Sequence, residues 1–310
     1  MSEISAPTAS PEPTAPGKKP MSNLTQRIIF AAIGAAMLLF CVWYSAWTFA
    51  LFFGLVQMRM LWEFYRMMRV AGYKPAALLG GGISLLIFAG VFGNTLFAYV
   101  ADGAVPKVAL EFFPARFVVV GVVILLPVIL ILREMYAWPR KNQQINPFTN
   151  VGINLLGLFY VSLPMSFLNL VACGPTGYDY RRILALLLLV WSSDIGAYAA
   201  GKTFGKHKLA PQISPGKTWE GAVGGFLLTL AMGWAMGYLL PELSVAYRLV
   251  VAGAVAVFGP LGDLAESMLK RSTGIKDSGR IMPGHGGLLD RFDAFLFILP
   301  VLALLQLMLR

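Results

Sequence analysis

Residues 181–201, RRILALLLLVWSSDIGAYAAG, contain one charged side chain after the two leading arginines, that of Asp194. A helix needs about 20 predominantly apolar residues to cross the hydrocarbon core of a bilayer. The stretch therefore predicts a membrane-spanning helix with a carboxylate at or near membrane depth. An ionisable residue there is costly and indicates function by default, although Asp194 can also simply hydrogen-bond to the neighbouring Ser192 or Ser193.

Runs of the same kind follow one another along most of the chain. Residues of the AVILMFWYC set make up 57% of it, charged residues make up 13%, and the mean hydropathy is +0.70. Because a soluble protein has about 25% charged residues, this composition excludes a cytosolic enzyme, a disordered chain and a fibre. We predict an all-α, polytopic integral membrane bundle of about nine transmembrane helices. The predicted spans are 28–44, 46–64, 76–99, 116–132, 149–171, 181–201, 219–240, 246–262 and 292–309.

The distribution of basic residues predicts the topology. Lysine and arginine accumulate in the cytoplasmic loops of membrane proteins. With nine spans and a cytoplasmic N-terminus, 19 of the 25 Lys and Arg residues fall on the cytoplasmic side and 6 on the other. The first two spans are either a tight helical hairpin or one long tilted helix, which would remove one span. The net charge of +10 needs no nucleic-acid partner, because topology accounts for it.

Three parts of the chain are distinguished by composition. Residues 1–22 are rich in Pro, Ala, Ser and Thr and predict a disordered tail. Residues 23–180 form a predicted transmembrane scaffold. Residues 181–310 form a predicted catalytic transmembrane region with cytoplasmic loops at 202–218 and 263–291. Two distant cysteines exclude a disulfide scaffold and a Cys-rich zinc site, and the lack of a visible internal repeat weakens a transporter interpretation.

Charge is concentrated between residues 263 and 293, which hold ten charged side chains. Asp263, Glu266, Ser267 and Lys270 have the spacing of one polar stripe on a helix that continues an apolar span. A carboxylate where a span meets water either binds a cation or simply ends the helix. The glycine-rich run at 282–287, MPGHGG, can bring bare N–H groups around an anion, and basic residues precede it.

Two carboxylates begin the last apolar run. Asp290 and Asp293 are three residues apart and share a helix face, which suits oxygen ligation of Mg²⁺; either can instead be an N-cap or a first-turn charge. Basic groups for phosphates together with carboxylates for a metal are what nucleotide chemistry needs.

A second polar cluster lies at residues 191–220. Gly216-Lys217-Thr218 is not a P-loop, because position 211, where that motif requires glycine, is proline. Lys217 and Ser214 either contact phosphates or belong to a loop whose charge only sets the topology. Glu63, in LWEFYR, has the environment of a structural carboxylate that pairs with Arg59 or Arg66.

Residues 267–294, SMLKRSTGIKDSGRIMPGHGGLLDRFDA, closely resemble the signature of the CDP-diacylglycerol synthases, or phosphatidate cytidylyltransferases. That signature runs S-x-x-K-R-x4-K-D and, after a spacer, G-H-G-G-x-x-D-R-x-D. The upstream SPGKTWEG, residues 214–221, is similar to a second loop of the family, although many members have lysine where this chain has Gly216.

The resemblance implies a multi-pass enzyme of the membrane, the inner membrane in a bacterium, with its active site facing the cytoplasm. The implied reaction joins CTP and phosphatidate into CDP-diacylglycerol and pyrophosphate, with Mg²⁺ and a monovalent cation such as K⁺, in a homodimer. The expected metal ligands are Asp263, Asp290, Asp293 and, as a second-cation or anchoring carboxylate, Asp194. The expected catalytic residues are Lys270, Arg271, Lys276, Asp277 and His285. The expected substrate-binding residues are Ser214, Lys217, Glu220, Ser267, Gly286, Gly287 and Arg291.

Two alternatives stay open at this point. A CTP-dependent lipid kinase, acting on dolichol or phytol, shares a similar C-terminal region but transfers the γ-phosphate to an alcohol. An ion-coupled transporter would place Asp194 and Asp263 along an ion path. CDP-alcohol phosphotransferases are excluded, since no D-G-x2-A-R run occurs.

Overall fold

The computed structural model describes residues 23–100, 115–138, 146–174, 176–279 and 286–308, and it is predominantly helical. The predicted tail, residues 1–22, lies outside these ranges. Each of the predicted spans coincides with a helical segment. The first five segments are α1 (Asn23–Tyr44), α2 (Ala46–Val70), α3 (Ala77–Val100), α5 (Ala115–Ala137) and the run α6 (Pro147–Gly157), η1 (Leu158–Ser162), α7 (Leu163–Ser166) and α8 (Leu168–Val171). The others are α9 (Tyr180–Phe204), α10 (Trp219–Ala235) with η2 (Met236–Tyr238), α11 (Val245–Ser272) and α12 (Leu289–Met308).

Six helical segments in the described residues are long and apolar enough to cross a membrane by length and composition. They are Ala77–Thr95, Pro147–Val171, Tyr180–Phe204, Trp219–Tyr238, Val245–Ser272 and Leu289–Met308. Ala31–Tyr44, the part of α1 whose side chains the structure describes, is a shorter apolar helix. The polytopic helical architecture is thus confirmed, whereas the count of nine spans and the orientation of the N-terminus stay predictions.

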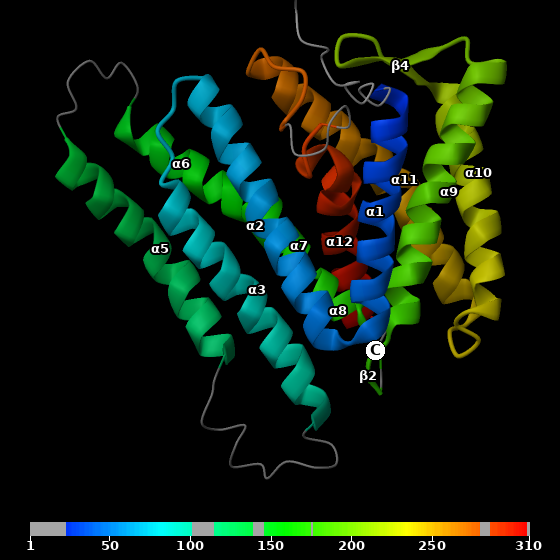
Figure 1. The fold of residues 1–310 in the computed structure, drawn as a ribbon, viewed down its shortest axis with the longest axis horizontal. Coiled ribbons are helices and arrows are strands. Elements are labelled where there is room, and N and C mark those ends of the chain that lie inside the picture. Colours follow the sequence, from blue (N-terminus) through cyan, green and yellow to red (C-terminus); the bar gives the residue numbers. More distant parts are fainter. Residues whose placement is uncertain (1–22, 101–114, 139–145, 175, 280–285, 309–310) are drawn as a thin grey trace, which may run out of the picture.

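The first two helices are separate. Ser45 lies between them in extended conformation and caps α2, because its hydroxyl accepts from the backbone N–H of Thr48 while the Thr48 hydroxyl accepts from the N–H of Ser45. Figure 1 shows α1 and α2 meeting at one end of the molecule and diverging toward the other. The alternative of one long tilted helix is therefore wrong.

Two features of the polar segments differ from the sequence prediction. Helix α11 continues through Ser272, so the first part of the predicted loop 263–291 is helical. Lys270 pairs with Glu266 one turn earlier, and both Lys270 and Arg271 lie in the last turn, where cations are favoured by the helix dipole. The predicted loop 202–218 contains an antiparallel pair, β3 (Lys208–Ala210) and β4 (Ser214–Thr218), and a second pair, β1 (Cys173–Gly174) and β2 (Gly177–Tyr178), lies before α9.

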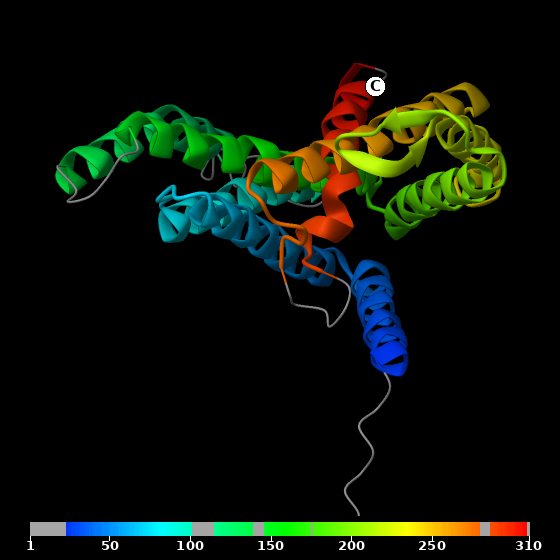
Figure 2. The same cartoon turned by 90° about the horizontal axis from the view of Figure 1, so that it is seen from above.

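Helix α12 joins the two halves of the bundle. It packs against α11 on one side and against α2, α7 and α8 on the other (Figure 1; Figure 2). On the far side of α11, α9 and α10 approach closely, because a Cβ atom at Gly196 would lie only 2.7 Å from the carbonyl oxygen of Gly224. The hairpin of β3 and β4 and the C-terminal end of α11 lie at one end of the molecule, and β2 and the end of α12 lie at the other.

Candidate functional site

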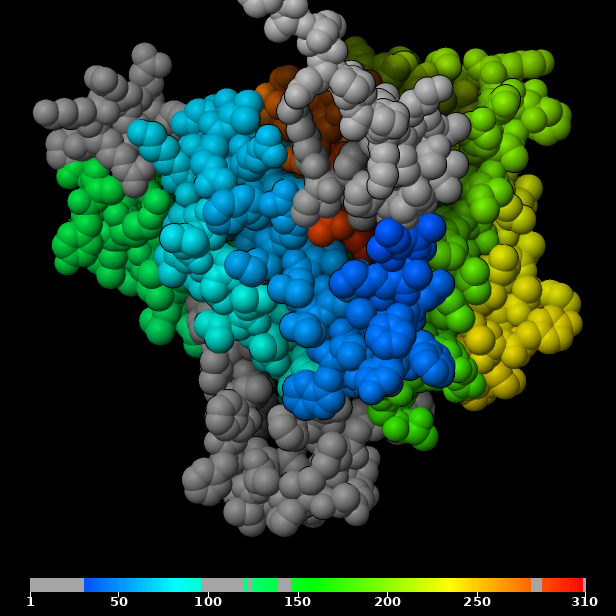
Figure 3. Space-filling view, in the orientation of Figure 1, coloured from blue at the N-terminus to red at the C-terminus, as the bar shows by residue number. Residues whose placement is uncertain are grey.

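A cavity of about 1200 Å³ lies between α1, α2, α9, α11 and the start of α12. In Figure 3 the red atoms of α12 are visible between the blue helices α1 and α2. Part of its lining is apolar and comes from α1, α2, α9 and α12, for example Leu38, Phe52, Val190 and Phe295. The lining also contains eight charged residues, namely Asp194, Lys202, Lys217, Asp263, Lys270, Asp290, Arg291 and Asp293.

Three carboxylates lie together at the charged part of the cavity, of which Asp263 and Asp293 line it and Glu266 is buried. Asp263 and Glu266 lie one turn apart on α11, and Asp293 lies in the first two turns of α12. One oxygen of each lies within 4.8 Å of the others. The two helices can come this close because Gly262 has no side chain; a Cβ atom there would lie 2.6 Å from the carbonyl oxygen of Asp293. We call Asp263, Glu266 and Asp293 the carboxylate cluster.

The carboxylate cluster has the donor set of a divalent-cation site. Like charges this close repel each other, and a cation removes that repulsion. Glu266 is 0% exposed, and its Oε1 has no hydrogen-bond partner among the described residues. Asp293 Oδ1 accepts from the backbone N–H of the adjacent Ala294, at 2.8 Å. Since hard cations such as Mg²⁺ take carboxylate oxygens, the residues present fit such an ion.

Two lysines flank the carboxylate cluster. Lys217, on β4, places its Nζ 2.8 Å from Asp263 Oδ2 and donates to the carbonyl oxygen of Pro260 at 3.0 Å. Lys270, on α11, contacts Glu266 Oε2 at 2.5 Å and Asp290 Oδ1 at 2.8 Å. Both lysines line the cavity. Their positive charge beside the carboxylates could bind the phosphates of a polyanion in the cavity.

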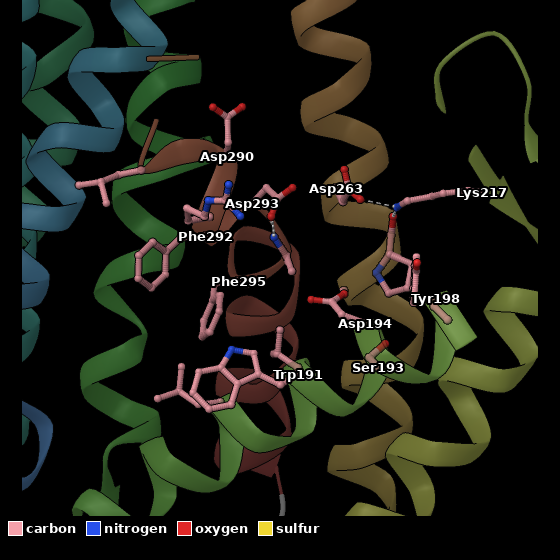
Figure 4. A pocket seen from close by; sticks show the side chains of 18 of the residues that line it. Trp191, Ser193, Asp194, Tyr198, Lys217, Asp263, Asp290, Phe292, Asp293 and Phe295 are labelled. Carbon is pink, nitrogen blue, oxygen red and sulfur yellow. Dashed lines mark hydrogen bonds and ion pairs between the residues drawn. The ribbon is translucent and has the colours of Figure 1, made fainter. Parts of the chain in front are cut away.

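Asp290 has a different environment from the carboxylate cluster. Besides Lys270, it accepts from the backbone N–H of Gly287 at 2.7 Å and from the Ser278 hydroxyl at 2.8 Å. The glycine-rich run thus does bind an anion through an N–H group, and that anion is the chain's own Asp290. Figure 4 shows Asp290 pointing away from Asp263, while Asp293 and Asp194 lie closer to it. Asp194 is exposed on α9 and faces the same cavity.

Several other predicted residues have structural partners. The Ser267 hydroxyl donates to Asp263 Oδ1 at 3.2 Å. The Glu220 carboxylate accepts from His207 Nδ1 at 2.6 Å and from the backbone N–H groups of Lys206 and His207, so it fastens the strand hairpin to the start of α10. Gly286 has positive φ and packs against Asp290. Arg291 lines the cavity.

The remaining predicted residues are not brought to the cavity as the structure describes it. Ser214 begins β4, and Arg271 lies in the last turn of α11, while Lys276 and Asp277 follow in the connection to α12. None of the four is among the cavity-lining residues. His285 lies outside the described residues.

Two carboxylates were not predicted in their present roles. Glu266 joins the carboxylate cluster although the expected metal ligands omitted it; its place in the i, i+3 stripe with Asp263 was the available signal. Glu63 is 0% exposed and receives hydrogen bonds from Ser278 and Leu289. Glu63 Oε1 also lies 3.3 Å from Arg59 Nε, so the predicted pairing with Arg59 is confirmed.

Comparison with known proteins adds an independent observation. The model of the Cytidylyltransferase family matches residues 25–309. A phosphatidate cytidylyltransferase of Bacillus subtilis is 33% identical over 285 residues, which cover 91% of this chain and 97% of that protein. Phosphatidate cytidylyltransferases of Staphylococcus haemolyticus and Staphylococcus aureus are 45% and 46% identical over 159 residues, and here the chain spans 60% of the length of each relative. The chain, with its charged cavity at the start of α12, belongs to the cytidylyltransferase family.

Proposed function

We propose that this protein transfers the CMP moiety of CTP to phosphatidate and releases pyrophosphate, forming CDP-diacylglycerol. The observation that carries the proposal is a single cavity with two kinds of wall. Carboxylates and lysines of α11, α12 and β4 form one part, and apolar side chains of α1, α2 and α9 form another. A water-soluble nucleotide and a lipid need these two environments next to each other. The relatives above are phosphatidate cytidylyltransferases, which agrees with this reaction.

The proposed reaction is an in-line displacement. An oxygen of the phosphatidate phosphate attacks the α-phosphorus of CTP, a new P–O bond forms, and the bond to the β-phosphate oxygen breaks. A phosphomonoester loses its second proton near pH 6, so the nucleophile is mostly dianionic at neutral pH. A strong general base is therefore not required, and the leaving pyrophosphate carries away the electron pair.

The charged residues divide this task. Asp263, Glu266 and Asp293 would hold Mg²⁺, and the ion would supply charge neutralisation for the phosphates. Lys217 and Lys270 each contact carboxylates of the site, and they bind the phosphates and the leaving group. Arg291 also faces the cavity and adds a planar donor for phosphate oxygens. We assign a monovalent cation such as K⁺ to Asp194, which is exposed to the same cavity.

We further propose a nine-span, multi-pass protein of the cell membrane with a cytoplasmic N-terminus and active site, acting as a homodimer. The excess of basic residues on one side supports this orientation. The hairpin of β3 and β4 and the C-terminal end of α11 share one end of the molecule (Figure 1), as that topology requires.

The test uses purified protein in detergent with phosphatidate, Mg²⁺ and CTP labelled at the α-phosphate. The account predicts that the label enters the lipid phase and that pyrophosphate appears in equal amount. A lipid kinase would leave the α-label in the aqueous phase as CDP and would act on an alcohol. Cation-dependent flux in liposomes without CTP would indicate a transporter. Either of these outcomes contradicts the proposal.

A further inference from the structure

Glu63 lies far from the carboxylate cluster in the sequence. In the structure it lies beside the segment that leads into α12, the helix that carries Asp293. Glu63 belongs to α2, in the half of the chain from which only apolar residues line the cavity. Its side chain is 0% exposed. Burying a carboxylate is expensive unless hydrogen bonds or an ion pair compensate, so the partners of Glu63 indicate what it does.

The hydrogen bonds to Glu63 come from the segment that leads into α12. Glu63 Oε2 accepts from the backbone N–H of Leu289 at 2.9 Å and, at 3.2 Å, shares the single proton of the Ser278 hydroxyl with Asp290. The Ser278 hydroxyl also lies 2.8 Å from Asp290 Oδ2. Glu63 is therefore joined to Asp290 twice, once through Ser278 and once through the first turn of α12.

Glycines on that segment fit closely around the same carboxylate. A Cβ atom at Gly279 would lie 2.5 Å from Glu63 Oε1, and one at Gly287 would also collide with the Glu63 carboxylate. The backbone can approach this closely only where side chains are missing. Gly287 is at the same time the residue whose N–H donates to Asp290. Gly279 and Gly287 thus lie against the Glu63 carboxylate, and Gly287 also binds Asp290.

The ion pair with Arg59 does not account for this arrangement. Arg59 Nε lies 3.3 Å from Glu63 Oε1, but neither atom has a hydrogen-bond partner among the described residues. The ion pair compensates charge without directional bonding. The directional bonds of Glu63 all go to Ser278 and Leu289.

We propose that Glu63 is a positioning residue of the active site, which acts through Ser278 and Leu289 on Asp290 and thereby on Lys270. Lys270 contacts both Asp290 and Glu266. A shift of Asp290 therefore changes the position of the Lys270 ammonium group beside the carboxylate cluster. This inference rests on the proposed function for its effect on turnover. Its structural part, the fastening of the start of α12 to α2, stands independently of the reaction.

The experiment compares Glu63→Ala and Glu63→Gln in the labelled-CTP assay. Glu63→Ala removes the acceptor, whereas Glu63→Gln keeps an amide oxygen of the same reach for Leu289 N–H and the Ser278 hydroxyl. Loss of a group that orients metal-site residues typically costs about 10- to 100-fold in activity, and we expect a loss in this range for Glu63→Ala with substantial recovery in Glu63→Gln. Equal loss in both variants, or none in Glu63→Ala, would overturn the proposal.

A double-mutant cycle tests the route. If Glu63 acts through Ser278, the combined Glu63→Ala, Ser278→Ala variant loses little more turnover than the more damaged single variant. Full multiplication of the two single losses would mean that the two residues act independently, which contradicts the route.

Hydrogen exchange measures the same contact without using activity. Glu63→Ala should accelerate exchange of the Leu289 and Gly287 amides, and Glu63→Gln much less. The matched control is Gln57→Ala, which removes another buried polar side chain of α2 whose bonds go to Ser84 and Ser166 instead; it should leave these amides and turnover unchanged. Unchanged exchange in Glu63→Ala would refute the role of Glu63, whereas an inactive wild-type protein with accelerated exchange in Glu63→Ala would refute only the proposed function.

Discussion

The two halves of the bundle bury polar side chains in opposite ways. In the scaffold helices the buried polar groups are mostly neutral, and they bond to one another. Gln57 Nε2 donates to the Ser84 hydroxyl at 2.9 Å, Ser162 donates to Ser84 at 2.8 Å, and Ser166 donates to Gln57 Oε1 at 3.2 Å. These bonds link α2, α3 and the η1–α7 segment. Such networks fasten helices in an apolar environment.

Around the cavity the polar groups are charged and only partly satisfied. Glu266 has an oxygen without a hydrogen-bond partner in the described part of the chain, although it is fully buried. One oxygen each of Asp263 and Asp293 lies within 4.8 Å of a Glu266 oxygen. The comparison teaches that the neutral groups named above bond to one another and hold the scaffold helices together, whereas Glu266 at the cavity keeps an oxygen available to a cation, as a ligand-binding site requires.

The largest expected effect is on the carboxylate cluster. Asp293→Asn removes one charge of the three and should lower turnover by about 100-fold or more, with helix content retained in circular dichroism. The matched control is Asp179→Asn, since Asp179 caps α9 away from the cavity and asparagine is an equally good cap. Near-normal turnover of Asp293→Asn would show that this residue is not part of the site and would contradict the difference drawn between the scaffold and the cavity.

A somewhat smaller effect is expected at the strand hairpin. Lys217→Met removes the ammonium group beside Asp263 but keeps the length of the side chain. Because a hydrogen bond to a charged group contributes about 1.5–3 kcal/mol, we expect kcat/KM for CTP to fall by about 10- to 100-fold. Lys208→Met, on the partner strand and exposed, serves as the control and should behave like the wild type. Equal losses in both variants would point to a general charge effect.

The neutral side of the comparison is tested by Asn154→Leu. Asn154 is 1% exposed, accepts from the N–H of Ala76 at 2.8 Å and donates to the carbonyl oxygen of Asn150 at 2.7 Å. Leaving these groups unpaired should cost about 1–3 kcal/mol of stability, seen as a lower midpoint of thermal unfolding in detergent. Turnover below that midpoint should be unchanged. Lost turnover without lost stability would contradict the division between the two halves.

The smallest effect is expected for Glu220→Gln. Glu220 accepts from His207 and two backbone N–H groups on an exposed hairpin. Exposed contacts of this kind contribute little, and we expect turnover to fall by less than about threefold. A loss as large as that of Asp293→Asn would show that Glu220 contacts substrate directly.

The sequence predicted the helices well because apolar length is a local property. The runs that begin near residues 77, 180 and 245 coincide with α3, α9 and α11. The end of α11 was less predictable. Its last turns are polar and resemble a loop by composition, although the spacing of Asp263, Glu266 and Lys270 already indicated one helical face.

The sequence predicted which residues belong to the candidate site better than it predicted which residues contact one another there. Asp263, Asp293, Lys217 and Lys270 were expected at one place, and the structure brings them to one cavity. That Asp290 is held by Ser278 and Gly287 depends on how the chain folds back, which spacing along the sequence does not encode. The partners of Glu63 lie 215 and 226 residues away, and no local pattern connects them.

The central claim is that Asp263, Glu266 and Asp293 form one cation site, and Glu266 tests it most directly because the sequence motif alone did not assign it. The measurement is Mn²⁺ binding to the purified protein by electron paramagnetic resonance, for the wild type, Glu266→Gln and the control Glu242→Gln, whose residue lies between η2 and α11 and does not line the cavity. The account predicts that Glu266→Gln weakens Mn²⁺ binding at least about tenfold, while Glu242→Gln binds as the wild type does. Wild-type affinity in Glu266→Gln would contradict the account.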